Sequence, residues 1–296
     1  MDISKYDLTG RAALISGASL GLGLSIARRL ARAGAGLFLC ARGEGRLKEA
    51  AAELESEKKR DSQKILWKAA DVSMEAEVNA LAKDALTAFP ELTILVSNAG
   101  IYGPMGRIED VSAQDFLRAV EINLMGPVLL SRALIPHFRK RGYGKIIQVS
   151  GGGATNPMPK IESYAASKAA VVRLMESLAL DLADFHVDVN SIAPGLLDTR
   201  LLREVLEAGP EAVGKAFYDR MKEASAKGTC TDPELAAALC QFLASAASDG
   251  ITGKLISAVW DDYESWPTHL KELLSSDAYT LRRLAGRDRG LSWGDK

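Results

Sequence analysis

The chain has 296 residues, of which 47% are hydrophobic and 25% are charged, and its formal net charge is −1. This composition is typical of a globular protein with a substantial buried core. The near-zero net charge excludes an electrostatic argument for binding nucleic acid or a membrane surface.

The cysteines, the histidines and the distribution of apolar residues predict a cytoplasmic protein without a metal site. Cys40, Cys230 and Cys240 are odd in number and lack metal-ligand spacing, which indicates reduced thiols. The three histidines are scattered along the chain, unlike a zinc site. The first nine residues contain charges and no apolar core, unlike a signal peptide, and no apolar run approaches the roughly 20 residues of a membrane helix.

Short apolar runs of strand length alternate with helical patterns along the chain. Strands are expected at Ala12–Ser16, Gly36–Ala41, Lys64–Ala69, Thr93–Ser97, Gly144–Ser150, Val187–Ile192 and Lys254–Ala258. Helices are expected at Leu24–Ala33, Ala50–Arg60, Glu75–Phe89, Ser112–Arg141 and Ser163–Leu182. The alternation predicts an α/β fold, a doubly wound Rossmann-type sheet of seven parallel strands with helices on both faces. We assign residues 1–258 to this single domain and residues 259–296 to a C-terminal extension.

The first predicted strand leads into a glycine-rich turn and then a helix. The turn reads Gly17-Ala18-Ser19-Leu20-Gly21-Leu22-Gly23. Strand, glycine-rich turn and helix are the layout of a dinucleotide phosphate site. Gly17 permits the tight turn, Gly21 lets the backbone approach a pyrophosphate, and Gly23 allows close helix packing. The alternative is a plain tight connection.

Tyr164 and Lys168 stand four positions apart in the predicted helix Ser163–Leu182, which contains no glycine or proline. This spacing puts the phenol and the ammonium on one helix face, about one turn apart. A fixed cation favours the phenolate, so we expect Lys168 to lower the pKa of Tyr164 from about 10. Taken alone, the pair also fits an ordinary surface helix.

Together, the glycine-rich turn and this pair resemble the short-chain dehydrogenase/reductase family, over roughly Leu8 to Leu255. Further matches are Asp71 after the third strand, Asn98-Ala99-Gly100 after the fourth, Asn123 in a helix and Pro194-Gly195 after the sixth. The resemblance implies an NAD(P)-dependent oxidoreductase that transfers a hydride between nicotinamide C4 and a carbonyl or carbinol carbon. It also implies a homodimer or homotetramer.

The resemblance implies roles for individual residues. Tyr164 is expected to be the acid in reduction and the base in oxidation, Lys168 to hold the nicotinamide ribose, and Asn123 to hold a water of a proton relay. Asp71 is expected to contact the adenine and Thr199 the nicotinamide carboxamide. The full set of implied cofactor contacts is Gly17, Ser19, Leu20, Gly21, Leu22, Gly23, Arg42, Asp71, Val72, Asn98, Ala99, Gly100, Tyr164, Lys168, Pro194, Gly195 and Thr199.

Three of these positions also fit structural roles. Asp71 suits a helix N-cap two or three residues before Met74, and one residue could do both. Asn98-Ala99-Gly100 fits a strand-to-loop turn. Asn123 fits a buried polar contact inside a helix.

The end of the second strand favours NADP(H), with NAD(H) possible. An enzyme that binds NAD usually has an acid here for the adenosine ribose, but this chain has Ala41 followed by Arg42. An arginine here can form charge-assisted hydrogen bonds with a 2′-phosphate. The alternative is a solvent-facing arginine at the start of the next helix.

One position departs from the family pattern. The family usually has a serine 13 positions before the tyrosine, but position 151 is glycine and the nearby serine is Ser150. A slip of one residue within a strand turns a side chain to the opposite face, although the glycines that follow permit a bulge. Three arrangements are open: a reoriented Ser150, which we favour as the catalytic serine, a backbone N–H of the glycine run, or a lost function.

Two segments are expected to shape the substrate side and the surface. Residues 196–228 should form a helical lid, broken at Gly209-Pro210, that sets specificity for a small carbonyl or alcohol substrate. Its apolar side chains also fit plain helix packing. The extension contains Arg282, Arg283, Arg287 and Arg289, and either wraps a neighbouring subunit or meets an anionic substrate. A second function of another class is a cofactor-binding sensor or assembly subunit without catalysis.

Overall fold

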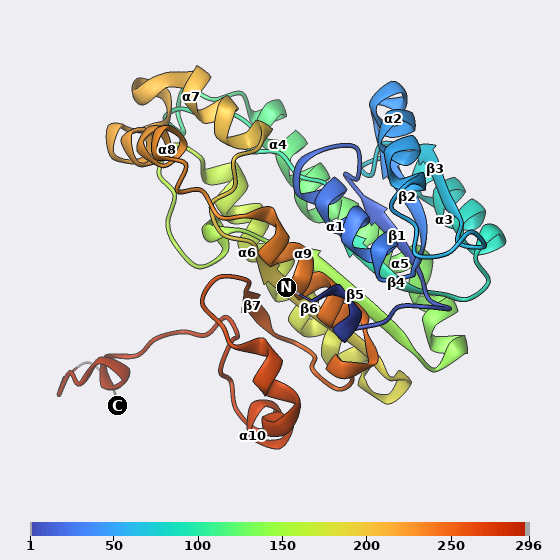
Figure 1. Ribbon diagram of the computed structural model, residues 1–296. Helices are drawn as coiled ribbons and strands as arrows, with labels where there is room; N and C mark the ends of the chain where they lie inside the picture. The colour runs from blue at the N-terminus through green and yellow to red at the C-terminus, as the bar shows by residue number, and fades with distance from the viewer. Residues whose placement is uncertain (1, 294–296) are drawn as a thin grey trace.

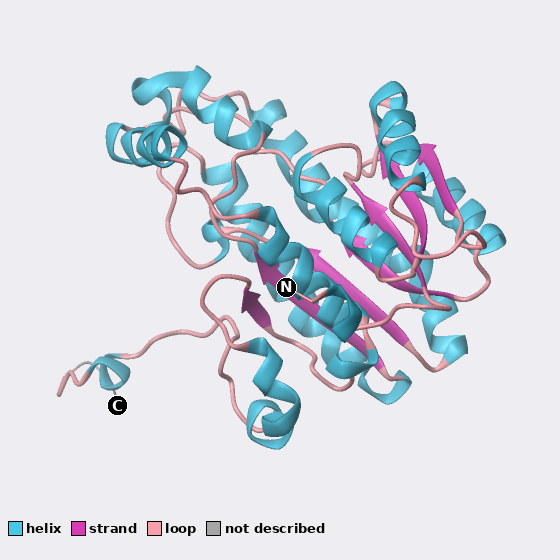
Figure 2. Ribbon diagram, viewed as in Figure 1, coloured by secondary structure: helices cyan, strands magenta, loops and turns pink. Residues whose placement is uncertain are grey.

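The computed structural model describes residues 2–293, which form one seven-stranded parallel sheet in the order β3-β2-β1-β4-β5-β6-β7 (Figure 2). The predicted fold class is therefore confirmed. The strands are β1 Ala12–Ser16, β2 Gly36–Ala41, β3 Ile65–Ala69, β4 Leu92–Ser97, β5 Gly144–Val149, β6 Val187–Ala193 and β7 Leu255–Ser257. The central strands are buried along their whole length because helices cover both faces of the sheet.

Successive side chains of one strand enter two different cores. In β1, Ala13 and Ile15 belong to the core on one face, and Ala12 and Leu14 to the core on the other. The first face is covered by α1 Gly21–Arg32, α2 Glu44–Glu55 and α9 Pro233–Ala244. The second face is covered by α3 Glu75–Ala88, α5 Gly126–Arg141 and α6 Glu162–Asp181.

The helix after β2 lies earlier in the chain than predicted. It spans Glu44–Glu55 and not Ala50–Arg60. Its buried side chains are Leu47, Ala50, Ala51 and Leu54, a spacing of three to four residues that forms one apolar face. Residues 57–60 offer no apolar side chain to continue that face, so the helix ends. Helix α9 was not among the predicted elements, although Asp232 caps it and Pro233 opens it.

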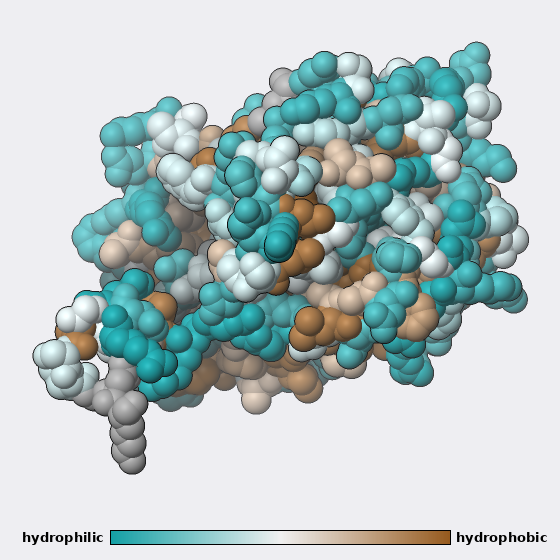
Figure 3. Space-filling view, turned by 90° about the horizontal axis from the view of Figure 1, so that it is seen from below, coloured by the Kyte–Doolittle hydropathy of each residue, from teal (hydrophilic) through white to brown (hydrophobic). Residues whose placement is uncertain are grey.

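The predicted long helix Ser112–Arg141 is interrupted. It consists of α4 Ala113–Val120, a π-helical segment Glu121–Met125 and α5. Within residues 2–293, this run alone is long and apolar enough to cross a membrane by composition, but half of its apolar window is buried in the fold, as in a core helix. On the face of the molecule in Figure 3, hydrophobic residues form small separate patches among hydrophilic ones.

In Figure 1 the lid lies at the upper left of the molecule, and the extension lies below β7. The lid consists of α7 Arg200–Val213, kinked at Gly209 where φ is +78°, and α8 Lys215–Lys227. The break predicted at Gly209-Pro210 is thus a kink, and the two helices separate at Gly214. The extension forms a 3-10 helix Tyr263–His269 and α10 Leu270–Leu274.

The first half of the extension is part of the main core. Tyr263, Trp266 and Leu273 belong to the same core as α1 and α9. The buried Lys254 Nζ donates hydrogen bonds to the carbonyl oxygens of Leu273, Ser276 and Ala278 at 2.8, 3.2 and 3.0 Å. These contacts hold the chain after β7 against the sheet edge.

The extension then passes along α6. The backbone N–H of Leu281 donates to Glu176 Oε1 at 2.6 Å, and Arg173 donates to the Leu281 carbonyl. Val171 and Val172 of α6 are fully buried in the core, so they do not lie on a face that a second subunit could cover. The helix turns them inward because they lie three to four residues from the buried Lys168 and Met175.

Candidate active site

A cavity of about 1270 Å³ runs along the carboxyl edge of the sheet, between the glycine-rich turn and the lid. Ligands of open α/β sheets bind at this edge. Every cofactor contact expected from the sequence lines the cavity, and so does Ser150. Asn123 does not line it. The four arginines of the extension are not among the described residues that line it either.

The glycines of the turn are required by space and by backbone conformation. Gly17 and Gly21 have φ of +65° and +55°, the left-handed region that favours glycine. A Cβ atom on Gly23 would be 2.1 Å from the Gly17 carbonyl oxygen. Asn98 Nδ2 donates to the carbonyl oxygens of Ser16 and Gly17 at 3.1 and 3.0 Å. Asn98 therefore fixes the turn, and α1 begins directly at it, with its N-terminal N–H groups at the cavity.

Asp71 has a structural partner that the sequence did not indicate. Its carboxylate accepts hydrogen bonds from the Ser73 N–H and hydroxyl at 3.0 and 2.7 Å and forms an ion pair with Arg118 of α4. Burial alone would raise the pKa of Asp71, but these hydrogen bonds together lower it. The N-cap of α3 is Met74, so Asp71 closes a local turn and does not cap the helix.

Arg42 is exposed at the mouth of the cavity, directly after β2. Within residues 2–293 it has no ion pair or hydrogen bond to a side chain. Arg46, in the first turn of α2, lines the same part of the cavity and pairs with Glu49. The sequence analysis did not single out Arg46, although it follows Arg42 by one helical turn.

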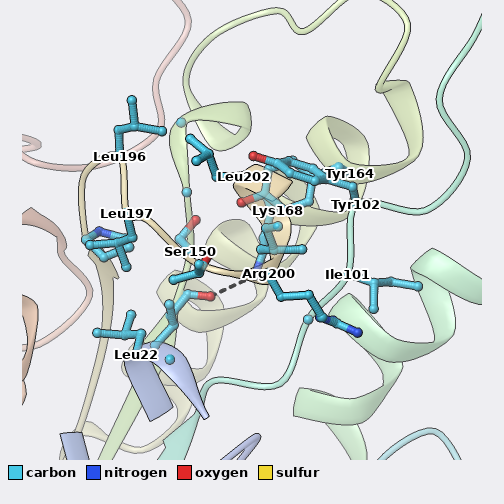
Figure 4. A pocket seen from close by; sticks show the side chains of 18 of the residues that line it. Leu22, Ile101, Tyr102, Ser150, Tyr164, Lys168, Leu196, Leu197, Arg200 and Leu202 are labelled. Atoms are coloured by element: carbon cyan, nitrogen blue, oxygen red, sulfur yellow. Dashed lines mark hydrogen bonds between the residues drawn. The ribbon is translucent and has the colours of Figure 1, made fainter. Parts of the chain in front are cut away.

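Tyr164 and Lys168 lie on the cavity side of α6, as their spacing predicts, and both are buried. Lys168 Nζ lies 5.7 Å from the centre of the Tyr164 ring and donates a hydrogen bond to the Val149 carbonyl at 2.9 Å, drawn dashed in Figure 4. A Cβ atom on Gly100 would lie 3.2 Å from Asn123 Oδ1 and 3.5 Å from Lys168 Nζ. Asn123 and Lys168 therefore both approach the place where a side chain at position 100 would begin.

The pKa of Tyr164 shifts opposite to our expectation in the structure. Burial, with a smaller effect of the neighbouring Tyr102, raises it above its ordinary value. Burial also lowers the pKa of Lys168 to about 8. The reason is that both groups are removed from water, and this desolvation favours the neutral phenol and the neutral amine.

Asn123 is held in the π-helical segment behind the cavity. Its Nδ2 donates to the Ile101 carbonyl at 2.9 Å and to Ser167 Oγ at 3.0 Å, and its Oδ1 accepts from the Ile101 N–H at 2.9 Å. The side chain thus ties the loop after β4 to α6. Asn123 thus makes the buried polar contact that the sequence analysis named as its alternative role. A π-helical turn often marks a functional site.

Ser150 and Gly151 follow the end of β5. The Ser150 hydroxyl oxygen is fully buried and has no hydrogen-bond partner among the described residues, so it does not bond to Tyr164. A Cβ atom on Gly151 would be 2.2 Å from the Tyr164 hydroxyl oxygen. The tyrosine hydroxyl therefore occupies the space that a side chain at position 151 would need.

The lid forms a third apolar cluster with Tyr164. Buried members from the lid are Leu202, Val205, Val213 and Met221. They pack with Tyr102, Ile161 and Tyr164, and Figure 4 shows Leu202 beside the tyrosine pair. The lid thus closes the cavity over Tyr164. Tyr102 was missed by the sequence analysis, although it follows Asn98-Ala99-Gly100 by two residues.

The model of the protein family described as "short chain dehydrogenase" matches residues 11–209 of the chain. The chain belongs to the short-chain dehydrogenase/reductase family. As a member, it is an NAD(P)-dependent oxidoreductase that acts on small molecules. The matched residues include the glycine-rich turn, Tyr164 and Lys168 and stop within the lid.

Related proteins extend this match over most of the chain. The human protein "Dehydrogenase/reductase SDR family member 4" is 31% identical over 254 residues, covering 84% of this chain and 86% of its own length. A gluconate 5-dehydrogenase from Burkholderia cenocepacia J2315, solved with NADP and tartrate, is 30% identical with a TM-score of 0.75 and covers 86% of this chain and 96% of its own. An NAD⁺-bound xylitol dehydrogenase is 25% identical with a TM-score of 0.74, covering 84% and 98%.

Proposed function

We propose that the protein reduces a small ketone or aldehyde with NADPH, and catalyses the reverse oxidation of the alcohol. One observation carries this proposal. The hydroxyl of Tyr164 has no hydrogen-bond partner among the described residues and lies in a cavity whose other end is a phosphate-binding turn. A dinucleotide bound along this cavity would bring its nicotinamide end toward Tyr164.

The described residues fit a dinucleotide. The turn at Gly17 and Gly23 leaves no room for a Cβ atom, and α1 offers free N–H groups for a pyrophosphate. Lys168 would hold the nicotinamide ribose, and Thr199, beside Gly21, the carboxamide. When bound, the nicotinamide donates or accepts the hydride; the protein supplies position and the proton.

Tyr164 could serve both directions of the reaction, and reduction is favoured only because Arg42 favours NADPH. When a hydride reaches the carbonyl carbon, the C=O electron pair moves to the oxygen, which takes a proton and becomes a hydroxyl. Tyr164 would donate that proton from its phenol and take it back in oxidation. Reduction requires the protonated phenol, and burial favours that form of Tyr164.

A preference for NADPH is supported by Arg42. It is exposed, unpaired within the described chain and placed where Ala41 offers no acid for a ribose hydroxyl. Arg46 adds a second cation at the same place. A 2′-phosphate would form charge-assisted hydrogen bonds with these guanidinium groups. One solved relative is bound to NAD⁺ and another to NADP, so the proposed preference rests on Arg42 and Arg46.

Self-association is a further part of the proposal. The outer face of α6 carries Ala166, Ala170 and Leu180, and Leu180 is 82% exposed. Small residues allow a second helix to approach closely, and an exposed leucine gains from being covered. We propose a homodimer or homotetramer through α6 and the α4–α5 run. A cytoplasmic location is also proposed, since the three cysteines are free thiols.

A second candidate function is a cofactor-binding sensor or assembly subunit without catalysis. The observation that favours it is Gly151, which removes the family's serine hydroxyl from the site. The Tyr164 hydroxyl facing the cavity argues against it, because a sensor does not need a free phenol beside the nicotinamide site.

One experiment separates the two functions. NADPH oxidation is followed with a panel of ketones, aldehydes and sugars, and NADPH affinity is measured in parallel by fluorescence. For wild type we expect turnover, and for Tyr164→Phe a loss of turnover with NADPH affinity changed by less than about threefold. Tight NADPH binding with no turnover on the whole panel would favour the sensor. Unchanged turnover by Tyr164→Phe would remove this residue as the proton donor.

A further inference from the structure

A second tyrosine lies beside Tyr164 in the cavity. Tyr102, in the loop after β4, also lines the cavity. The two ring centres are 4.7 Å apart and the ring planes make an angle of 62°, an edge-to-face contact. Figure 4 shows both rings side by side, pointing into the cavity from the same wall.

Both phenols are buried without a hydrogen-bond partner. Tyr102 is 9% exposed and Tyr164 is 7% exposed. Within residues 2–293, neither hydroxyl makes a hydrogen bond. The two hydroxyl oxygens are not among the fully buried atoms, and both residues line the cavity. A polar atom of a ligand in the cavity can therefore hydrogen-bond to either phenol.

The backbone fixes Tyr102 in this position. Ser163 Oγ donates a hydrogen bond to the Tyr102 carbonyl at 3.1 Å, and Ser163 directly precedes Tyr164 in α6. The next residue, Gly103, has φ of +76°, and a Cβ atom there would be 2.7 Å from Ser163 Oγ and 2.6 Å from Ala119 Cβ. The loop is thus pressed against α4 and α6, and the two rings keep their relative position.

Tyr102 can donate a hydrogen bond from a neutral phenol. Burial raises its pKa to about 12, with the lid residue Glu204 raising it and Arg220 of α8 lowering it to a smaller extent. The phenol is therefore neutral at physiological pH and keeps its proton. A neutral phenol that faces a developing negative charge stabilises it as an oxyanion-hole donor does.

Ser150 is in a weaker position for the same role. Its hydroxyl oxygen is sealed inside the protein, whereas the phenol oxygens of Tyr102 and Tyr164 are not among the sealed atoms. Gly151 has no side chain to offer. The hydroxyls of the two tyrosines are therefore more accessible than the hydroxyl of Ser150.

We propose that Tyr102 is a catalytic residue that donates a hydrogen bond to the substrate oxygen, in the role for which Gly151 has no side chain. This inference rests on the proposed function. During reduction the hydride forms the new C–H bond and the C=O electron pair moves to the oxygen. Tyr164 transfers its proton to that oxygen, and Tyr102 stabilises the charge while keeping its own proton.

The test compares Tyr102→Phe with Ser150→Ala. Because Phe retains the ring contact and removes an unpaired hydroxyl, we expect an unchanged melting temperature and unchanged NADPH affinity. With the best substrate of the panel, kcat and kcat/KM of Tyr102→Phe should both fall about 10²-fold, the loss typical of one oxyanion-hole donor. The loss of kcat for Ser150→Ala should be smaller than the loss for Tyr102→Phe. Full activity of Tyr102→Phe, or a loss confined to Ser150→Ala, would overturn the proposal.

A second measurement does not require turnover. The affinity of the enzyme–NADPH complex for 2-pyrrolidinone, an unreactive carbonyl compound, is measured by calorimetry. Tyr102→Phe should weaken binding about three- to tenfold, the range for one neutral hydrogen bond, and Ser150→Ala should not. This weakening without any wild-type turnover would keep Tyr102 as a carbonyl-binding residue and reject the proposed reaction. Wild-type binding that Tyr102→Phe leaves unchanged would overturn the role of Tyr102, as would the absence of both binding and turnover in the wild type.

Discussion

The hydroxyl of Tyr164 lies where a side chain of residue 151 would begin. A Cβ atom on Gly151 would be 2.2 Å from the hydroxyl oxygen and 3.2 Å from the ring carbon that bears it. The φ of Gly151 is 175°, an extended conformation open to any residue. Glycine is therefore needed at this position for space, and the family's serine cannot be placed at 151 unless the tyrosine moves.

Gly151→Ala should displace Tyr164 and reduce turnover. The added methyl group has to push the ring away, at a cost of about 1–3 kcal/mol in the free energy of unfolding, as for overpacked cores. We expect kcat to fall at least about tenfold. The matched control is Gly152→Ala, because a Cβ atom there would meet nothing within 4 Å. An equal kcat for Gly151→Ala and Gly152→Ala would show that turnover does not depend on the position of the Tyr164 hydroxyl next to residue 151.

Arg42→Ala should weaken NADPH binding and leave NADH binding nearly unchanged. A hydrogen bond to a charged group contributes roughly 1.5–3 kcal/mol, so the dissociation constant for NADPH should rise about 10- to 100-fold. Fluorescence titration with both cofactors measures this directly. Arg283→Ala, an exposed arginine of the extension, is the control. An equal loss for NADPH and NADH would mean that Arg42 does not contact the 2′-phosphate.

Lys168 should make the stability of the ligand-free protein depend on alkaline pH. Its pKa is about 8 in the folded protein against an ordinary value of 10.5. Between these values the unfolded chain holds the proton more tightly, so the free energy of unfolding rises with pH. Relative to Lys168→Met, wild type should gain about 2–3 kcal/mol between pH 7 and pH 10. Urea unfolding at both pH values measures the difference. If the free energy of unfolding of wild type relative to Lys168→Met stays constant or falls between pH 7 and pH 10, burial does not lower the pKa of Lys168.

Leu180→Glu should weaken self-association. Leu180 is 82% exposed on the outer face of α6, and a glutamate covered by a second subunit would lose its hydration. Light scattering at micromolar concentration should show a dimer or tetramer for wild type and a shift to smaller species for the variant. Ile108→Glu, at an exposed position in the loop before α4, serves as the control. A monomeric wild type would reject the proposed oligomer.

The sequence by itself determined the features that depend on residues close together in the chain. The turn from Gly17 to Gly23 is predictable because glycine alone tolerates its backbone and its close packing. The pairing of Tyr164 with Lys168 follows from helical spacing. The seven strands were predicted within a few residues because each is an apolar run bounded by polar or glycine residues. The alternation of these strands with helices predicted the parallel sheet.

Only the tertiary structure decided the contacts between distant segments. It placed Tyr102 beside Tyr164, Arg118 on Asp71, and the Tyr164 hydroxyl over Gly151. It also reversed the expected direction of the Tyr164 pKa shift, since helical spacing records the neighbouring lysine but not the loss of water around both groups. These outcomes depend on which elements pack together and how completely they exclude solvent, and no local pattern in the chain encodes that.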